Sequence, residues 1–471
     1  MTINWMDEVL QRKEKILSET SEFLSFPSIL DETTAAPNAP FGKKVAEALE
    51  YILEKGTKDG FSTKNVEGYA GHIHYGSYKE TVGVLCHVDV VPPGDGWTND
   101  PFSPVIKDGK LFARGAIDDK GPTMAAYFAL QLIKDLELPL SKNIRLIIGA
   151  DEESEWRCVK RYFEEEPVPD TGFAPDAEFP VIFAEKGICD FFFKGAGSKS
   201  KDGKADFHLD KFNAGHRLNM VPEKAEAHIT AESEQKASDV AERFESFLKK
   251  EEVTGRKERS GDTLVLTLEG KAAHGSLPQQ GINAGVLMAQ FLNKVPMDKR
   301  GRSFVELIST HFSDFVGEKA GIEIEDEVSG HLTINPGLVR YNEETDELGV
   351  NIRYPVKASY ETIKAQLEHI AQKFENKIDV AAHKGPHFVD PEDPLVQTLQ
   401  KVYEKYTEDK SSPIAIGGGT YARAMTSGVA FGPLFPGREE VAHQRDEHIF
   451  VEDLLKCTAI YAEALYELSK K

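Results

Sequence analysis

Five short segments of the chain place histidine and carboxylate side chains at points where one structural element gives way to the next. They are His87-x-Asp89, Asp118-Asp119, Asp151-Glu152-Glu153, Asp176 and His443. Imidazole nitrogens and carboxylate oxygens suit borderline-hard divalent cations better than thiolate-loving metals. Crowded carboxylates repel one another unless a cation lies among them. Together the segments therefore indicate a divalent metal site.

Taken singly, each segment has a plainer structural interpretation. The two aspartates precede a helix and can cap it, and the acids after residue 150 can form a solvated loop. Asp176 can occupy a turn, and His443 can be a surface histidine. Only the combination of the segments favours the metal site.

The first segment follows an apolar run that begins at Gly83 and is typical of a buried strand. Alternation along a strand puts His87 and Asp89 on one face, while Cys86 and Val88 face the other way. Strand ends that open into loops are where α/β folds place their chemistry. We therefore expect the pair to lie at the edge of a sheet.

The elements around these segments predict an α/β fold. Helical spacing covers residues 41–55, an amphipathic helix is expected over 121–136, a strand over 144–148, and a last helix over 451–468. Helices that alternate with strands predict a mixed, largely parallel sheet covered by helices.

The middle of the chain has a different texture. A small, polar, loop-like stretch at 195–207 opens it, and a strand, a Lys-Ala-Ser triplet and an amphipathic helix then occur twice, around 236–238 and 357–359. This repeat predicts an inserted α+β lid domain made of two related halves. We expect one domain in two segments, 1-187 and 384-471, with the lid domain inserted at 188-383.

Composition limits the classes of partner. The 471 residues include 56 Lys plus Arg against 78 Asp plus Glu, a net charge of −22, which argues against nucleic acid and anionic membranes. The chain shows neither a long uncharged apolar run nor the order of a signal peptide, so we expect a cytoplasmic protein. Four widely spaced cysteines form no CxxC pair and predict buried, reduced thiols.

The order and wording of the motifs resemble those of the di-metal peptidases related to carboxypeptidase G and aminoacylase. The likeness is carried by CHVDVVPPGDGW, RGAIDDKGPT, DEESEW, FAPDAEFP and the later His443, and it covers essentially the whole chain. It implies a catalytic domain with an inserted lid, and a metal-dependent dipeptidase. Such an enzyme would cleave short unblocked peptides with a free C-terminus by attack of a metal-bound water, releasing the N-terminal residue.

The resemblance also implies a ligand set for two divalent ions. Asp118 would bridge the ions, His87 and Asp176 would complete one of them, and Glu153 and His443 the other. Zn²⁺ is the first expectation, with Mn²⁺ and Co²⁺ as alternatives.

Further roles follow from the same resemblance. The bridging acid is assigned to Asp118 rather than Asp119 because in the family this acid lies two residues before a lysine, which is Lys120 here. Asp89 would orient the ring of His87, and Glu152 would be the general base.

In the inserted domain, His274 resembles a lid histidine that holds the scissile carbonyl oxygen. The resemblance implies contacts to the substrate carboxylate for Asn219 and Arg353. The glycines Gly417, Gly418 and Gly419 precede a probable helix, and such a turn can offer backbone N–H groups to the same carboxylate. A duplicated lid can replace a dimer contact, so we expect a monomer.

Other functions stay open at this point. An N-acyl-amino-acid deacylase would use the same chemistry, and a non-catalytic metal- or peptide-binding protein would need neither Glu152 nor His274. A serine hydrolase is disfavoured because the sequence has no GxSxG turn.

Overall fold

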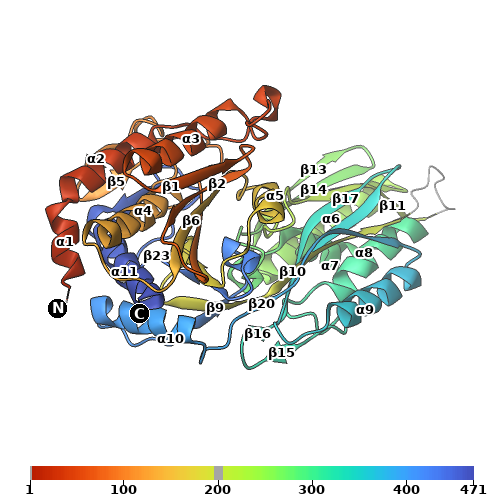
Figure 1. Ribbon diagram of the computed structural model, residues 1–471. Coiled ribbons are helices and arrows are strands. Elements are labelled where there is room, and N and C mark those ends of the chain that lie inside the picture. Colours follow the sequence, from red (N-terminus) through yellow and green to blue (C-terminus); the bar gives the residue numbers. More distant parts are fainter. Residues whose placement is uncertain (1–2, 196–204, 471) are drawn as a thin grey trace. The chain divides into compact units, whose positions relative to one another are not determined.

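The computed structural model describes residues 3–195 and 205–470. The chain divides into two compact units (Figure 1). Unit 1 comprises Met1–Phe183, Val389–Ile414 and Gly419–Lys471, and unit 2 comprises Ala184–Phe388 and Ala415–Gly418. Residues 196–204 of the stretch that we predicted as a loop lie outside the described residues.

Unit 1 is built on a mixed sheet. Its strands, in spatial order, are β1 (Ser62–Val66), β2 (Ala70–Tyr75), β6 (Asn143–Gly149), β3 (Thr81–His87), β7 (Thr171–Ala174), β22 (Gly428–Phe431) and β9 (Val181–Glu185). The central pairs β6–β3, β3–β7 and β7–β22 are parallel, and the flanking pairs are antiparallel. The predicted mixed α/β sheet is confirmed, with its parallel part at the centre.

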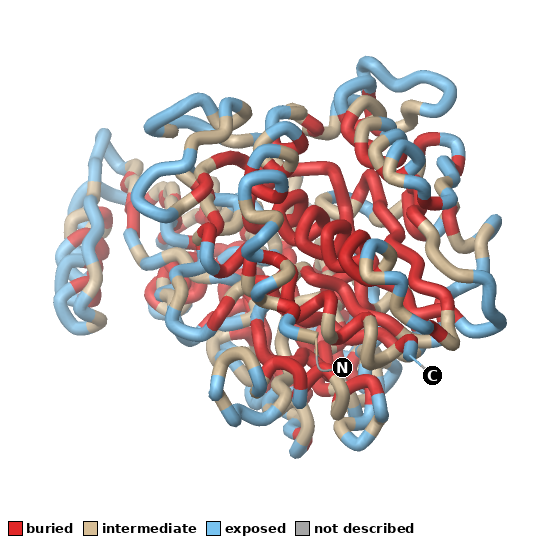
Figure 2. The backbone as a smooth tube through the Cα atoms, turned by 60° about the vertical axis from the view of Figure 1, so that its left-hand side comes forward, coloured by how far each residue is buried: buried red, intermediate tan, exposed pale blue. Residues whose placement is uncertain are grey.

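Helices surround this sheet. They are α1 (Trp5–Gln11), α2 (Lys13–Leu24), α3 (Lys43–Lys58), α4 (Lys120–Asp135), α5 (Arg157–Glu165), α10 (Pro394–Thr407) and α11 (Val451–Ser469). Helices α4 and α11 pack on each other and on β3 and β6, whereas α5 packs on β1 and β2. In Figure 2, buried residues run through the central helices and strands, while exposed residues gather at the periphery.

Helix α4 differs from the amphipathic helix that we predicted. Every residue from Lys120 to Ile133 is buried, because α2 and α11 cover the sides of α4 that the sheet leaves open. It is therefore a core helix.

Short sheets complete unit 1. One contains β4 (Val105–Lys107), β5 (Lys110–Phe112) and β24 (His448–Phe450), and another pairs β8 (Ala177–Glu178) with β23 (Pro433–Leu434).

Unit 2 contains an antiparallel sheet. Its strands, in spatial order, are β13 (Thr254–Ser260), β14 (Thr263–Glu269), β12 (Lys224–Ala231), β11 (Phe207–Ala214), β17 (Thr333–Tyr341), β18 (Asp346–Tyr354), β10 (Gly187–Lys194) and β19 (Lys377–Lys384). Its helices are α6 (Glu234–Lys250), α7 (Ala284–Leu292), α8 (Lys299–His311) and α9 (Tyr360–Lys373). Their apolar faces share one core with the sheet.

The sheet of unit 2 shows the two related halves. Strand β12 leads into α6 and then the edge strand β13, and β18 leads into α9 and then the opposite edge strand β19. In each half one further strand, β14 or β10, lies between the edge strand and the strand before the helix, and β11 pairs with β17 at the centre. The repeat seen in the sequence is therefore a repeat of structure.

No helix in the described part of the chain has the length and apolar character needed to cross a bilayer. The four cysteines carry free, buried thiols.

Candidate metal centre and substrate-binding cluster

The side chain of His87 lies fully buried at the end of β3. Its Nδ1 lies 3.0 Å from the carbonyl oxygen of Asp89 and donates a hydrogen bond to it, while Nε2 lies 3.0 Å from Asp118 Oδ1 and 3.8 Å from Asp176 Oδ2. Nε2 is buried and makes no hydrogen bond within the described residues. A ring nitrogen that faces two carboxylates in this way fits a metal ligand, since the other nitrogen is fixed by its acceptor.

Asp118 lies between two histidines. Its Oδ1 faces His87, and its Oδ2 lies 2.9 Å from His443 Nε2. Burial raises the pKa of Asp118, but the contacts with His443 and His87 outweigh it and hold that pKa below its ordinary value. Two oxygens that face opposite partners suit a carboxylate bridging two cations.

His443 approaches the cluster from the loop before β24. Its Nε2 also lies 2.9 Å from Glu153 Oε1, and its backbone has a φ of 61°. Burial lowers the pKa of His443, yet the Asp118 and Glu153 carboxylates raise it to about 11. The ligand atoms of Asp118, Glu153 and His443 lie within 4.8 Å of one another.

A second group of potential ligands comprises His87, Glu152 and Asp176, again with ligand atoms within 4.8 Å. Burial raises the pKa of Glu152 to about 8, and the neighbouring Glu153 and Asp118 carboxylates add to the shift. Burial and Asp118 likewise raise the pKa of Asp176 well above its usual value. A bound cation would offset the cost of ionising these acids, so the donor set fits divalent metal ions.

Asp89 has a broader part than the one that we predicted. Its Oδ1 lies 3.5 Å from His87 Nδ1, within ion-pair distance, but its backbone carbonyl is the hydrogen-bond acceptor for that ring. The carboxylate accepts the backbone N–H groups of Glu152 at 3.1 Å and Glu153 at 3.0 Å. Asp89 therefore links the end of β3 to the acidic loop.

The remaining two acids of the motifs have other partners. Asp119 Oδ2 accepts the backbone N–H of His87 at 3.1 Å and the hydroxyl of Thr123 at 3.3 Å. Asp151 accepts two hydrogen bonds of 2.9 Å from the guanidinium of Arg157. Both carboxylates are held by the scaffold.

Sequence reasoning missed Glu447. This fully buried glutamate lies 2.6 Å from Arg114 Nη1 and accepts the backbone N–H groups of Gly115 at 3.1 Å and Ile117 at 2.9 Å. It lies four residues after His443 and holds the loop that carries Asp118. In the sequence, only its position next to Asp446 and His448 pointed to Glu447, and so charged a segment is typical of the protein surface.

Unit 2 brings the other predicted site residues together. The backbone N–H of Gly275 donates to Asn219 O at 2.7 Å, and an isolated β-bridge joins Met220 to His274. Arg353 Nη1 donates to Gly417 O at 3.0 Å. A side chain added at Gly417 would meet the Cβ of Ser276 at 2.9 Å, so the glycine allows a close approach.

The ring of His274 is held in one tautomer. Its Nδ1 lies 2.6 Å from Ser276 Oγ and accepts the backbone N–H of Ser276 at 3.3 Å. Because a backbone N–H only donates, Nδ1 is an acceptor and the neutral ring carries its hydrogen on Nε2. Burial and the charge of Arg353 lower the pKa of His274, which favours this neutral donor form.

Gly418 belongs to unit 2 with Gly417, whereas Gly419 belongs to unit 1, where a side chain added to it would meet Arg423. The predicted glycine turn is therefore shared between the two units along the chain.

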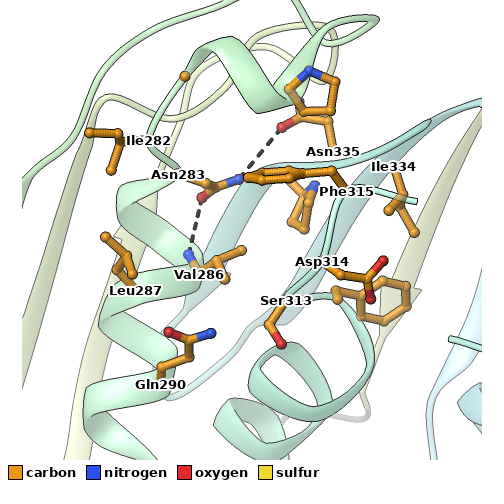
Figure 3. A pocket seen from close by; sticks show the side chains of 14 residues that line it. Ile282, Asn283, Val286, Leu287, Gln290, Ser313, Asp314, Phe315, Ile334 and Asn335 are labelled. Atoms are coloured by element: carbon orange, nitrogen blue, oxygen red, sulfur yellow. Dashed lines mark hydrogen bonds between the residues drawn. The ribbon is translucent and has the colours of Figure 1, made fainter. Parts of the chain in front are cut away.

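Unit 2 also has an apolar cavity of about 180 Å³ (Figure 3). Asn283 lies in its wall, caps α7 through the N–H of Val286 at 3.0 Å and donates to Pro336 O at 3.0 Å. This polar side chain serves the scaffold, and the cavity contains none of the predicted site residues.

The fold and the site define a class of protein. A mixed α/β unit carries two adjoining histidine and carboxylate groups at its strand ends, and an antiparallel unit carries a cluster with a donor histidine and a buried arginine. These are the features of a metal-dependent hydrolase with an inserted second domain.

The comparison with known proteins identifies the family. The model of Peptidase family M20/M25/M40 matches residues 83–467, and the chain belongs to this family of metallopeptidases. The chain is 49% identical to "Putative dipeptidase YtjP" of Bacillus subtilis over 99% of this chain and 100% of that protein. It is 41% identical to a protein of Staphylococcus haemolyticus that is also named a putative dipeptidase, over 98% and 99% of the two chains. The predicted family is confirmed.

Solved structures show the same fold at low identity. Human carnosine dipeptidase 1 has a TM-score of 0.58 at 14% identity, with 98% of each chain covered. Aminoacylhistidine dipeptidase from Vibrio alginolyticus has a TM-score of 0.59 at 14% identity, with 96% of each chain covered.

Proposed function

We propose that this metallopeptidase is a dipeptidase that cleaves short unblocked peptides with a free C-terminus and releases the N-terminal residue. The observation that carries the proposal is the position of Asp118 between the two ligand groups, with one oxygen 3.0 Å from His87 and the other 2.9 Å from His443. Full-length relatives that are named dipeptidases support it.

We propose the following metal ligands. Asp118 would be held between two cations, His87 and Asp176 would bind one of them, and Glu153 and His443 would bind the other. Zn²⁺ is the first candidate, and Mn²⁺ or Co²⁺ also suits imidazole and carboxylate ligands. Two such cations, when bound, supply a water of lowered pKa and stabilise charge on the scissile carbonyl oxygen.

Glu152 is proposed as the general base. It takes a proton from the attacking water while the water oxygen bonds to the carbonyl carbon, and it passes that proton to the departing amine as the C–N bond breaks. Its half-buried position and raised pKa suit a group that must both accept and return a proton. Asp89 positions Glu152 and Glu153 through their backbone N–H groups and His87 through its ring.

Unit 2 is proposed to recognise the substrate as a lid domain, and unit 1 to be the catalytic domain. His274 would donate from Nε2 to the oxygen that becomes negative during the reaction. Arg353, Asn219 and the turn at Gly417, Gly418 and Gly419 would bind the C-terminal carboxylate, for which a planar guanidinium is suited.

The test is hydrolysis of a dipeptide panel by metal-stripped protein that is reconstituted with one ion at a time. We expect turnover of free dipeptides only after an ion is added, and little turnover of dipeptide amides or N-acyl amino acids. Turnover of N-acyl amino acids but not of dipeptides would replace the proposal with a deacylase. Metal binding without any turnover would indicate a binding protein.

A further inference from the structure

Three polar side chains form a row across adjacent strands of unit 2. Asn335 on β17 is opposite Asn351 on β18, and Asn351 is opposite Asp190 on β10. Asn335 and Asn351 are 0% and 1% exposed. Residues opposite one another across a sheet point to the same face.

The row lies on the face of the sheet away from the helices. The strand neighbours Ile334, Val350 and Ile352 belong to the core that the helices share. Because side chains alternate along a strand, the row points the other way. The buried polar face of the sheet is therefore the face that carries Arg353, two residues along β18 from Asn351.

Asn351 connects Arg353 to Asp190. Its Oδ1 accepts from Arg353 Nε at 3.0 Å, and its Nδ2 donates to Asp190 Oδ1 at 2.6 Å. The guanidinium only donates and a carboxylate only accepts when ionised, so the two neighbours fix which way the amide points. The charge of Arg353 is thereby connected to Asp190 through one amide.

The guanidinium of Arg353 is held on two sides. Nε is bound by Asn351, and Nη1 donates to Gly417 O at 3.0 Å. The residue is 6% exposed, so few rotamers are open to it. Asn335 holds the Asn219 loop in the same manner, because its Nδ2 donates to Leu218 O at 2.8 Å and Met220 O at 2.9 Å.

We propose that Asn351, oriented by Asp190, is a positioning residue that sets the rotamer of Arg353 for the carboxylate of the substrate. This inference rests on the carboxylate role that the proposed function gives to Arg353. A leucine at position 351 would fill similar space and could not hold Nε. Orientation of the arginine, rather than packing of the strand, is the property that the amide supplies.

The first experiment compares a free dipeptide with the matching dipeptide amide. We expect Asn351→Leu to lower kcat/KM on the free dipeptide about tenfold, on the order of one lost hydrogen bond, mainly through KM. The amide should change by less than about twofold. Asp190→Leu should act in the same direction, and Asp190→Asn, which keeps an acceptor, should restore most of the efficiency.

Two further variants make the test specific. In an Arg353→Leu background, Asn351→Leu should have no additional effect, because the two residues act as one unit. Asp298→Asn is the matched control, since Asp298 is a buried acid of unit 2 whose carboxylate accepts the N–H groups of Gly301 and Leu209. This variant should alter stability without changing the ratio of kcat/KM on the free dipeptide to kcat/KM on the dipeptide amide.

A crystal structure of the Asn351→Leu variant provides a readout that needs no turnover. We expect strand β18 to be unchanged and the Arg353 guanidinium to have left Gly417 O. An unmoved guanidinium, or equal losses on acid and amide, would overturn the inference. Wild-type protein that turns over no dipeptide would refute the proposed function instead, and the position of Arg353 in the variant would still decide this inference.

Discussion

The carboxylate of Asp118 is preorganised, because neighbouring side chains contact both of its oxygens. His87 and His443 approach it from opposite sides, and the backbone of its loop is held by the buried carboxylate of Glu447. The proposed ligands are thus arranged before a cation binds. A preorganised carboxylate pays little reorganisation energy when an ion binds.

The first prediction concerns the general base. Glu152→Gln should keep the metal content and lower turnover by at least about a hundredfold, because a positioned base is worth that much or more. Metal content by elemental analysis and kcat on one dipeptide check it. Glu155→Gln, an exposed glutamate of the same loop, is the control and should behave as wild type. Loss of metal together with activity would make Glu152 a ligand, which its grouping with His87 and Asp176 allows.

The second prediction concerns His443. His443→Ala should lose one ion and the activity together, because Asp118 and Glu153 alone form an incomplete set of ligands. His448→Ala is the matched control, since its Nδ1 donates to Asp446 O and its ring contacts Phe112. If metal content fell in the His448 variant instead, the ligand assignment would move to that residue.

Residues that could be predicted from sequence are those whose chemistry shows locally. The spacing of His87 and Asp89 at a strand end and the crowding of Glu152 and Glu153 are visible in the sequence, and in combination with the other three segments they indicate a metal site. Glu447 could not be predicted, because its partners lie more than 300 residues away and its neighbours in sequence look exposed. Which acid turns toward the site is likewise a tertiary property.

At the scale of elements, the sequence patterns predicted the bounds of helices and strands better than they predicted which faces of those elements are buried. The last helix was expected over 451–468 and is Val451–Ser469, and the strand expected over 144–148 is Asn143–Gly149. Helix α4 was expected to be amphipathic because its spacing fits one apolar face. Its full burial depends on α2 and α11, which the local pattern does not reveal.

The third prediction concerns the packing of α5 on β2. His72 is buried in β2 and its Nδ1 lies 2.7 Å from the hydroxyl of Tyr162 in α5. Burial, assisted by Arg145, lowers the pKa of His72 to about 4. In the unfolded chain His72 has the ordinary histidine pKa of about 6.5. Between pH 6.5 and about pH 4 the unfolded chain therefore binds a proton at His72 that the folded protein does not bind.

Stability should accordingly fall as the pH is lowered from about 6.5 to about 4, by about 3 kcal/mol in total from this residue. His72→Gln should remove this part of the acid sensitivity, which thermal unfolding at several pH values measures. The exposed His369→Gln is the control and should keep the wild-type profile. Equal acid sensitivity in the His72 variant and wild type would show that His72 is protonated in the folded protein.

At the scale of the whole molecule, the chain folds as two units, and the residues of the predicted metal site belong to one of them. All candidate metal ligands lie in unit 1, whereas the repeat of strand and helix lies in unit 2. The core of unit 2 is built from its own strands and helices. Stability therefore should not respond to metal in the same way throughout the chain.

The last prediction follows from this division. A ligand that binds only the folded state stabilises it by about 2.7 kcal/mol at a free concentration one hundred times its dissociation constant. For a unit of this size, that gain corresponds to a rise of about 5 to 10 °C in the unfolding temperature. Adding Zn²⁺ to metal-stripped protein should raise the unfolding temperature of unit 1 and leave that of unit 2 unchanged.

Hydrogen exchange of peptides from β3 and from β12, followed during heating, assigns each transition to its unit. The Asp118→Asn variant should lose most of the shift, because it weakens the carboxylate that we propose as the bridge between the two ions. Equal protection of both strands by the metal would show instead that the two units unfold as one cooperative body.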